Sequence, residues 1–143
     1  MVTDPIRIIV VDDHKLARES ISLLLGSDER FSVIQSCSNG HDAIQQGRQL
    51  CPDIMLVDIN MDPVDGFTVA EQVLETNPSI KIIGISVNNT VQYAYRMLTI
   101  GARGFVTKGS SLDEVIHAIM EVHNGRKFVS SDLRGTLPEG QSL

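Results

Sequence analysis

Acidic side chains stand directly after two of the most apolar stretches of the chain. Asp12 and Asp13 follow the run IRIIVV, and Asp58 follows the run IMLV. Short apolar runs bounded by polar residues are typical of buried β-strands. Carboxylates that converge at the ends of such strands would repel one another and raise the pKa of at least one of them. A divalent cation relieves this repulsion, so we expect a metal site here.

The expected ligands of this metal site are oxygen atoms alone, without a cysteine or a histidine. Such a ligand set favours a hard ion, Mg²⁺ first, which binds through one or two carboxylates and keeps several waters. The two cysteines, Cys37 and Cys51, have neither CxxC spacing nor a histidine partner. We expect both to be buried, reduced thiols.

Two further polar side chains follow later apolar runs. Ser86 follows IKIIGI, and Lys108 follows GFVT. They would offer a hydrogen-bond donor and a positive charge to phosphate oxygens. With a metal and a carboxylate at the same place, they indicate phosphoryl chemistry with Asp58 as the acceptor.

Several of these residues also have an ordinary structural interpretation. An Asp-Asp pair after a strand is often a helix N-cap, and a serine there is often part of a turn. Asp65, which precedes Gly66, favours a turn and a helix cap, and Asp62 is interpreted as loop charge. The functional interpretation therefore depends on the combination: all four strand ends carry residues that suit phosphoryl chemistry.

Strand-like runs alternate with amphipathic helical patterns along the chain. The expected strands cover residues 6–11, 31–37, 53–57, 80–85 and 104–106. The helical patterns cover residues 15–26, 41–50, 66–77, 90–101 and 111–125. This alternation predicts a doubly wound α/β fold, with a five-stranded parallel sheet and helices on both faces. Ligands of such folds bind outside the carboxyl ends of the strands, where the polar residues above would lie.

Two helical patterns carry more detailed signals. In the first, Ile21, Leu24 and Leu25 share the face expected to point inward. In the last, Ser111 and Glu114 have the spacing of a capping box.

Composition limits the classes of function. A chain of 143 residues, 42% of them hydrophobic, is long enough for one domain with a core. The formal net charge of −6 argues against nucleic-acid binding by this chain itself. It lacks both the roughly 18 unbroken apolar residues of a membrane span and a secretory signal pattern, so we expect a cytoplasmic protein. Residues 126–143 lose periodicity, and we expect a linker or tail there after a domain of residues 1–125.

The segments VVDDH, VDINMDPVDG, GISVNN and GFVTKG resemble the motifs of the response regulator receiver domain, the CheY-like module of two-component signalling. The likeness covers residues 6–125 and implies the flavodoxin-like strand order 2-1-3-4-5. The segments DDHKLARESISLLL and GARGFVTKGSSLDEVIHAIMEVHNGRKFVSSDL further resemble the NarL/FixJ-type subgroup. A helix-turn-helix DNA-binding domain usually follows the receiver in that subgroup, and such an effector is absent from this chain.

The resemblance implies a role for each residue at the strand ends. Asp58 matches the phosphoacceptor, and Asp13 matches a direct Mg²⁺ ligand with Asp12 as its neighbour. Asn60 stands where the family offers a backbone carbonyl to the metal, so Asp12, Asp13, Asp58 and Asn60 form the implied metal site.

The same resemblance implies a switch. Ser86 matches the hydroxyl that follows the phosphoryl group, and Lys108 matches the lysine that pairs with it. Phe105 matches the switch aromatic, with a place in the core as its structural alternative. Asn60 and Asn88 occupy positions that tune the lifetime of the phosphoryl group.

A phosphoacceptor of this kind assists its own phosphorylation and dephosphorylation and is not an enzyme. The implied donor is a sensor histidine kinase, and the implied response is a change in the face formed by residues 90–101, 104–106 and 111–125. Homodimerisation on phosphorylation and DNA binding through an effector domain would follow. The alternatives are a stand-alone phosphorelay receiver, a Mg²⁺-dependent aspartyl-phosphate phosphatase and a flavodoxin-like nucleotide binder.

Overall fold

The computed structural model describes residues 4–87, 91–131 and 133. The strands in these ranges are β1 (Ile6–Val11), β2 (Phe31–Cys37), β3 (Ile54–Asp58), β4 (Lys81–Ser86), β5 (Gly104–Thr107) and β6 (Phe128–Val129). The helices are α1 (Lys15–Gly26), α2 (Gly40–Leu50), α3 (Gly66–Thr76), α4 (Val91–Ile100) and α5 (Leu112–His123). Asn88, to which the sequence assigns a tuning role, lies outside the described residues.

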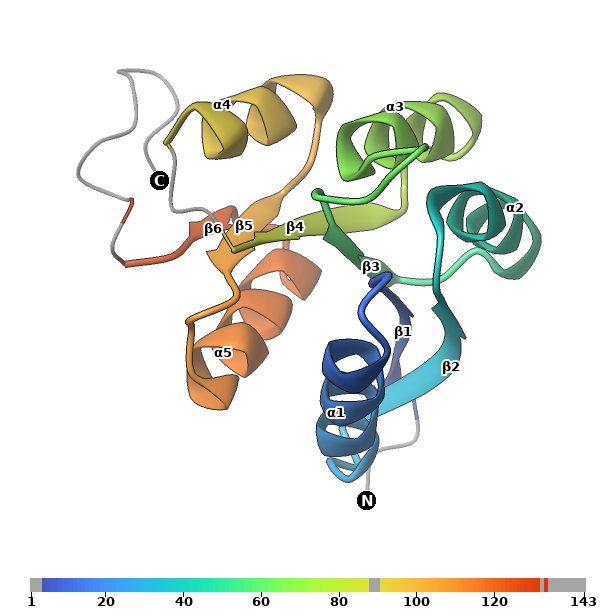
Figure 1. Ribbon diagram of the computed structural model, residues 1–143. Helices are drawn as coiled ribbons and strands as arrows, with labels where there is room; N and C mark the ends of the chain where they lie inside the picture. Colours follow the sequence, from blue (N-terminus) through green and yellow to red (C-terminus); the bar gives the residue numbers. More distant parts are fainter. Residues whose placement is uncertain (1–3, 88–90, 132, 134–143) are drawn as a thin grey trace.

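The strands form one sheet in the order β2-β1-β3-β4-β5-β6, and every neighbouring pair is parallel. Helices α1 and α5 cover one face, and α2, α3 and α4 cover the other (Figure 1). The predicted α/β fold and the order 2-1-3-4-5 are confirmed, and a short sixth strand is added at the β5 edge. No helix within the described ranges is long and apolar enough to cross a membrane.

The sheet brings the ends of β1 and β3 together. Val11, the last residue of β1, pairs with Val57 of β3. The acidic residues that follow these two positions, Asp12 and Asp58, therefore reach the same edge as neighbours. All five residues of β3 are buried, as expected for a central strand with helices on both faces.

The last strand lies in the stretch expected to be a linker or tail. Phe128 packs in the apolar layer under α1 and α5, whereas Val129 packs in the layer under α3 and α4. Phe105 pairs with Val129, and the amide of Ser130 donates a hydrogen bond to the Phe105 carbonyl at 2.9 Å. Residues after α5 thus extend the sheet that carries the strand ends.

The helix starts follow local sequence signals. Asp65 accepts a hydrogen bond from the amide of Thr68 at 2.9 Å, which confirms it as the N-cap of α3. Ser111 caps α5 by accepting from the amide of Glu114 at 3.1 Å. The Glu114 carboxylate accepts a hydrogen bond from the Ser131 hydroxyl at 3.2 Å, on the segment that follows β6.

Two sequence expectations about burial are wrong. Leu24, expected on the inward face of α1, is 47% exposed, while Leu25 beside it is fully buried. Cys37 is buried as expected, but Cys51 is exposed because it ends α2 in a left-handed conformation at the surface. Both thiols are free.

Candidate functional site

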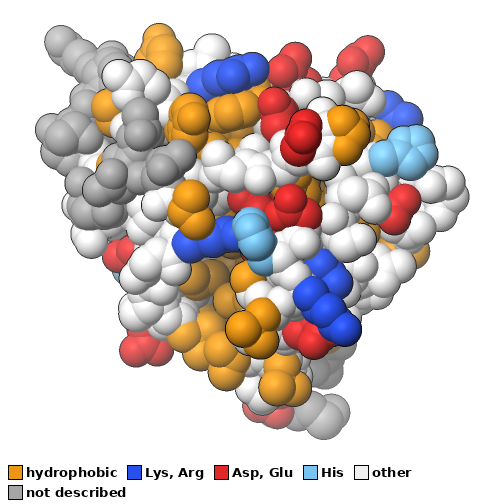
Figure 2. Space-filling model, viewed as in Figure 1, with side chains coloured by type: hydrophobic (Ala, Val, Ile, Leu, Met, Phe, Trp, Pro, Cys, Tyr) orange, Lys and Arg blue, Asp and Glu red, His pale blue; other side chains and the backbone are white. Residues whose placement is uncertain are grey.

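Three carboxylates converge at the carboxyl edge of the sheet. Asp58 ends β3 and is 1% exposed, and its Oδ1 accepts a hydrogen bond from the amide of Asn60 at 3.0 Å. Asp12 is also buried, whereas Asp13 is exposed. Ligand atoms of the three, and of His14, all lie within 4.8 Å of one another. Figure 2 shows acidic side chains grouped in the middle of this face, beside a histidine and a cationic side chain.

Lys108 contacts two of these carboxylates and the His14 ring. Its ammonium group lies 2.9 Å from Asp12 Oδ2 and 3.4 Å from Asp58 Oδ2. Its backbone amide donates to the carbonyl of Ser86 at 2.8 Å, which fixes the start of the loop after β5 against the end of β4. The sequence prediction that Lys108 lies beside Asp58 is therefore supported by the geometry.

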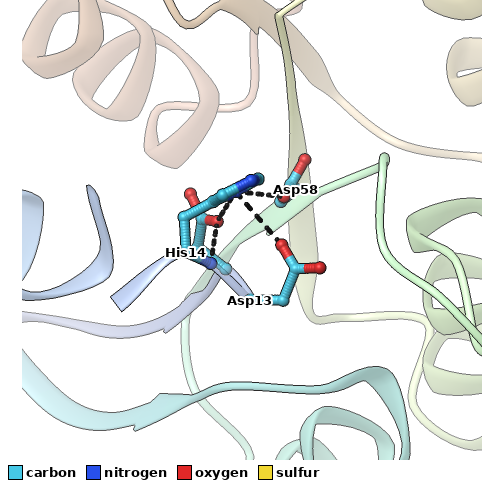
Figure 3. Close-up of side chains that lie close together, drawn as sticks. Asp13, His14 and Asp58 are labelled. Atoms are coloured by element: carbon cyan, nitrogen blue, oxygen red, sulfur yellow. Dashed lines mark hydrogen bonds and ion pairs between the residues drawn. The ribbon is translucent and has the colours of Figure 1, made fainter. Parts of the chain in front are cut away.

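His14 is the fourth member of the group, so a histidine does lie close to the site for which only oxygen ligands are expected. Its Nδ1 lies 3.0 Å from Asp12 Oδ1, 3.1 Å from Asp13 Oδ1 and 3.8 Å from Asp58 Oδ2 (Figure 3). The sequence signal for His14 was its position directly after the Asp-Asp pair. Sequence reasoning assigned roles to the two aspartates and none to the histidine. Arg18 was also missed; its guanidinium donates to the Asp12 carbonyl at 2.9 Å.

The remaining predicted residues lie around Asn60 and in the core. The Ser86 hydroxyl is buried and donates to Asn60 Oδ1 at 2.9 Å. The side chains of Ser86 and Asn60 therefore hold each other next to Asp58. Phe105 is fully buried, and a Cβ atom on Gly84 would lie 3.1 Å from its ring. Phe105 thus occupies the core position that was its structural alternative.

The surroundings of the two buried carboxylates, Asp12 and Asp58, shift their pKa values in opposite directions. Burial raises the pKa of Asp58, and the nearby charge of Asp12 adds to the rise, against the Asn60 hydrogen bond and Lys108. Burial acts on Asp12 too, but hydrogen bonds from His14 and Lys108 outweigh it and lower the pKa of Asp12. Both shifts follow from how many donors reach each carboxylate.

The donor set fits a hard divalent cation. Three carboxylates face one ammonium group, Lys108, so negative charge is in excess even with Lys108 in place. Carboxylate oxygens are the ligands that Mg²⁺ prefers. Receiver domains bind Mg²⁺ through an acidic pocket, and Asp12, Asp13 and Asp58 form an acidic cluster here.

In the described residues, a parallel sheet is flanked by five helices and has an acidic pocket at its carboxyl edge. This combination defines a class of signalling domain. Residues 8–120 match the response regulator receiver domain, and the chain belongs to that family. This family is the receiver domain of two-component systems. The relatives and the similar solved structures support membership of the NarL/FixJ-type subgroup.

Curated relatives are longer than this chain. The response regulator GacA of Pseudomonas aeruginosa is 32% identical over 128 residues, which are 90% of this chain and 60% of GacA. The response regulator UvrY of Escherichia coli is 29% identical over 90% of this chain and 59% of UvrY. The chain thus spans about 60% of the length of these relatives.

Solved structures share the fold. A LuxR-family two-component response regulator from Aurantimonas sp. SI85-9A1 superposes with a TM-score of 0.87 at 25% identity, over 91% of this chain and 93% of that one. The signal receiver domain of the putative response regulator NarL from Mycobacterium tuberculosis superposes with a TM-score of 0.82 at 29% identity, over 86% of this chain and 99% of that one.

Proposed function

We propose that this receiver domain is a phosphorylation switch in which Asp58 accepts a phosphoryl group from a phosphohistidine of a histidine kinase. The observation that carries the proposal is the placement of Asp58. It ends the central strand at 1% exposure, with an ammonium group and two further carboxylates around it. A purely structural carboxylate has no need of such neighbours.

The proposed transfer exchanges one bond for another. A carboxylate oxygen of Asp58 attacks the phosphorus atom, and the new P–O bond forms as the P–N bond to the donor imidazole breaks. The electron pair of the broken bond returns to the donor nitrogen. Lys108, already 3.4 Å from Asp58 Oδ2, would hold an oxygen of the incoming group.

The carboxylates of Asp12, Asp13 and Asp58 and the backbone carbonyl of Asn60 would hold the Mg²⁺ ion. When bound, the ion supplies positive charge that offsets the charge of the transferred group. The lowered pKa of Asp12 favours the ionised carboxylate that this role needs. Arg18 fixes the backbone of Asp12 through a hydrogen bond to its carbonyl.

The switch would depend on Ser86, Lys108 and Phe105. A phosphoryl group on Asp58 would compete with Asn60 for the Ser86 hydroxyl and with Asp12 for the Lys108 ammonium. Phe105 lies two residues before Thr107 in β5, so a shift at that end of the strand would reach its ring. The face made by α4, β5 and α5 would then change its preference for partners. A near-complete shift needs roughly 5.5 kcal/mol of differential stabilisation.

The proposed partner is a sensor histidine kinase, and the proposed output is transcription. One solved structure that shares this fold is a DNA-binding response regulator of the LuxR family from Staphylococcus aureus, and homodimerisation on phosphorylation would couple the switched face to an effector of that kind. Residues 1–125 would form the receiver together with β6 (Phe128–Val129) from the expected linker of residues 126–143, and the residues after β6 would lead towards the effector. A cytoplasmic location agrees with the free thiols Cys37 and Cys51.

A stand-alone phosphorelay receiver would use the same chemistry and differ only in its output. A phosphatase of the haloacid dehalogenase type would carry its nucleophile in a D-x-D motif after the first strand. Here the acids after β1 are adjacent, and the proposed acceptor follows β3. We therefore propose a phosphoacceptor that assists its own phosphorylation and dephosphorylation, rather than a turnover enzyme.

The test is intact-mass measurement after incubation with Mg²⁺ and acetyl phosphate. We expect the mass of one phosphoryl group on the wild type and none on Asp58→Asn. Asp62→Asn is the matched control, because this exposed loop acid lies four residues away and should leave the addition intact. Phosphorylation of Asp58→Asn to the wild-type level would refute the assignment, as would a wild type that accepts nothing from either acetyl phosphate or a phosphorylated kinase.

A further inference from the structure

His14 has a position that the proposed phosphoryl transfer does not use. It stands at the N-cap of α1, yet its side chain makes no capping hydrogen bond to that helix. Its backbone amide donates to Asp12 Oδ1 at 2.9 Å, which fixes its main chain to the acidic pocket. The imidazole extends over the pocket and keeps 63% of its surface exposed (Figure 3).

The spacing of His14 from the carboxylates is that of neighbouring ligands on one ion. Its Nδ1 lies 3.0 Å from an oxygen of Asp12 and 3.1 Å from an oxygen of Asp13. Adjacent ligands of an octahedral ion with bonds of about 2.1 Å are themselves about 3 Å apart. Asp58 Oδ2 lies 3.8 Å from the same nitrogen, and the Lys108 ammonium lies 3.3 Å from it, so an ion bound to Nδ1 would take the place of this Lys108 contact.

We propose that His14 is a fourth ligand of the cation site and that it sets the metal preference of this receiver. The inference rests on the proposed function in one respect, namely that Asp12, Asp13 and Asp58 bind a divalent cation. An imidazole nitrogen favours Co²⁺, Ni²⁺ and Zn²⁺, whereas Mg²⁺ prefers oxygen ligands. The pocket thereby gains affinity for first-row transition metals, while its affinity for Mg²⁺ depends on the oxygen ligands, namely the three carboxylates and the Asn60 carbonyl.

A competing role for His14 makes the opposite prediction. If the imidazole served as a cationic partner of the carboxylates, it would repel an incoming ion. Its removal would then strengthen the binding of every divalent cation alike. As a ligand, its removal weakens the binding of transition metals selectively.

The experiment is calorimetric titration of the untagged chain with Ni²⁺ and, separately, with Mg²⁺ at one neutral pH. His14→Ala should bind Ni²⁺ at least about tenfold more weakly and Mg²⁺ within about threefold of the wild type. The change to alanine removes no N-cap hydrogen bond from α1, because the histidine side chain makes none. His41→Ala, an exposed histidine at the start of α2, is the control and should match the wild type for both ions.

A spectroscopic measurement tests the ligand directly. With Mn²⁺ as the probe, electron spin-echo modulation from a bound nitrogen should appear in the wild type and in His41→Ala, and vanish in His14→Ala. Equal Ni²⁺ affinities in the wild type and His14→Ala, or nitrogen modulation that survives in His14→Ala, would overturn the inference alone. Failure of the wild type to bind Mg²⁺ would instead overturn the cation site of the proposed function.

Discussion

The contrast between Asp12 and Asp58 shows how a few donors decide the chemistry of a buried carboxylate. Both residues are at most 6% exposed, so both carboxylates would lose hydration in the same way. Asp12 receives the His14 amide and the closer contact of Lys108, whereas Asp58 receives the Asn60 amide and a longer contact of Lys108. The pKa of Asp12 is therefore lowered and that of Asp58 is raised.

This contrast predicts opposite stability effects for two isosteric substitutions. Because the pKa of Asp58 lies above its usual value when folded, its ionised form costs stability, and that cost appears as the pH rises through the raised pKa. Asp58→Asn removes the cost and should raise the unfolding midpoint at neutral pH, without metal, by roughly 2–4 °C. Thermal unfolding in a chelating buffer measures this change.

Asp12→Asn is the matched comparison. Because the pKa of Asp12 is lowered on folding, its ionised form adds stability above the unfolded pKa, and this is lost as the pH falls through the folded pKa. The substitution should therefore lower the midpoint at neutral pH by a similar amount. The advantage of Asp58→Asn should shrink as the pH is lowered towards 3.8. A destabilised Asp58→Asn at neutral pH would contradict the electrostatic account.

The sequence predicted the residues at the strand ends better than their contacts. A polar residue after an apolar run identifies a strand end, and parallel strands bring such ends to one edge. It does not reveal which donor reaches which acceptor. The Ser86–Asn60 hydrogen bond and the approach of His14 to three carboxylates depend on loop paths that periodicity cannot supply.

At the scale of elements, the start of α3 is pressed against the strand that carries the acceptor. The Gly66 amide donates to the Ile59 carbonyl at 3.2 Å. A Cβ atom on Gly66 would lie 2.5 Å from the Ile59 Cα atom and 2.7 Å from the Asp58 carbonyl oxygen. Glycine is needed here for close approach, and the loop after Asp58 takes its path from that contact.

Gly66→Ala should therefore destabilise the fold and slow phosphorylation. The methyl group must push backbone, not a flexible side chain, so we expect a loss of about 1–3 kcal/mol in the free energy of unfolding. Gly109→Ala is a sharp control, because it adjoins Lys108 and its Cβ atom would meet nothing within 4 Å. Denaturant titration measures both variants, and equal effects would show that the α3 contact is unimportant.

The elements themselves were largely predictable, with informative exceptions. Five strands stand out in the sequence as short apolar runs, and five helices have the period of 3.6 residues that sequence reasoning detects. The sixth strand, with two residues, is too short to show a period. Leu24 shows a different limit: three leucines follow one another in α1, and only packing decides that Leu25 is buried while Leu23 and Leu24 face outward.

At the scale of the whole molecule, β6 connects the two apolar layers at the open edge of the sheet. Its two residues face opposite layers, and Ser130 continues the contact by accepting a hydrogen bond from the Thr107 amide at 3.0 Å. Unpaired edge strands invite pairing with other chains. The segment after α5 covers the edge that β5 would otherwise expose.

Val129→Ser should lower the free energy of unfolding by about 2–3 kcal/mol, because it removes fully buried apolar surface and buries a hydroxyl group. Lys127→Ser, two residues earlier and exposed, should stay within about 0.5 kcal/mol of the wild type. Denaturant unfolding compares the two. If both variants match the wild type, β6 does not belong to the cooperative fold.

The direction of β6 also decides to which edge of the sheet the chain returns after α5. Helix α5 runs back across the sheet, so a chain that departed at its end would depart from the edge opposite the acidic pocket. Because β6 runs parallel to β5, it carries the chain forward again and brings Ser130 beside Thr107, next to Lys108. The end of β6 and the acceptor thus share one rim of the molecule, where Lys108 contacts Asp58 and the neighbouring Thr107 contacts Ser130.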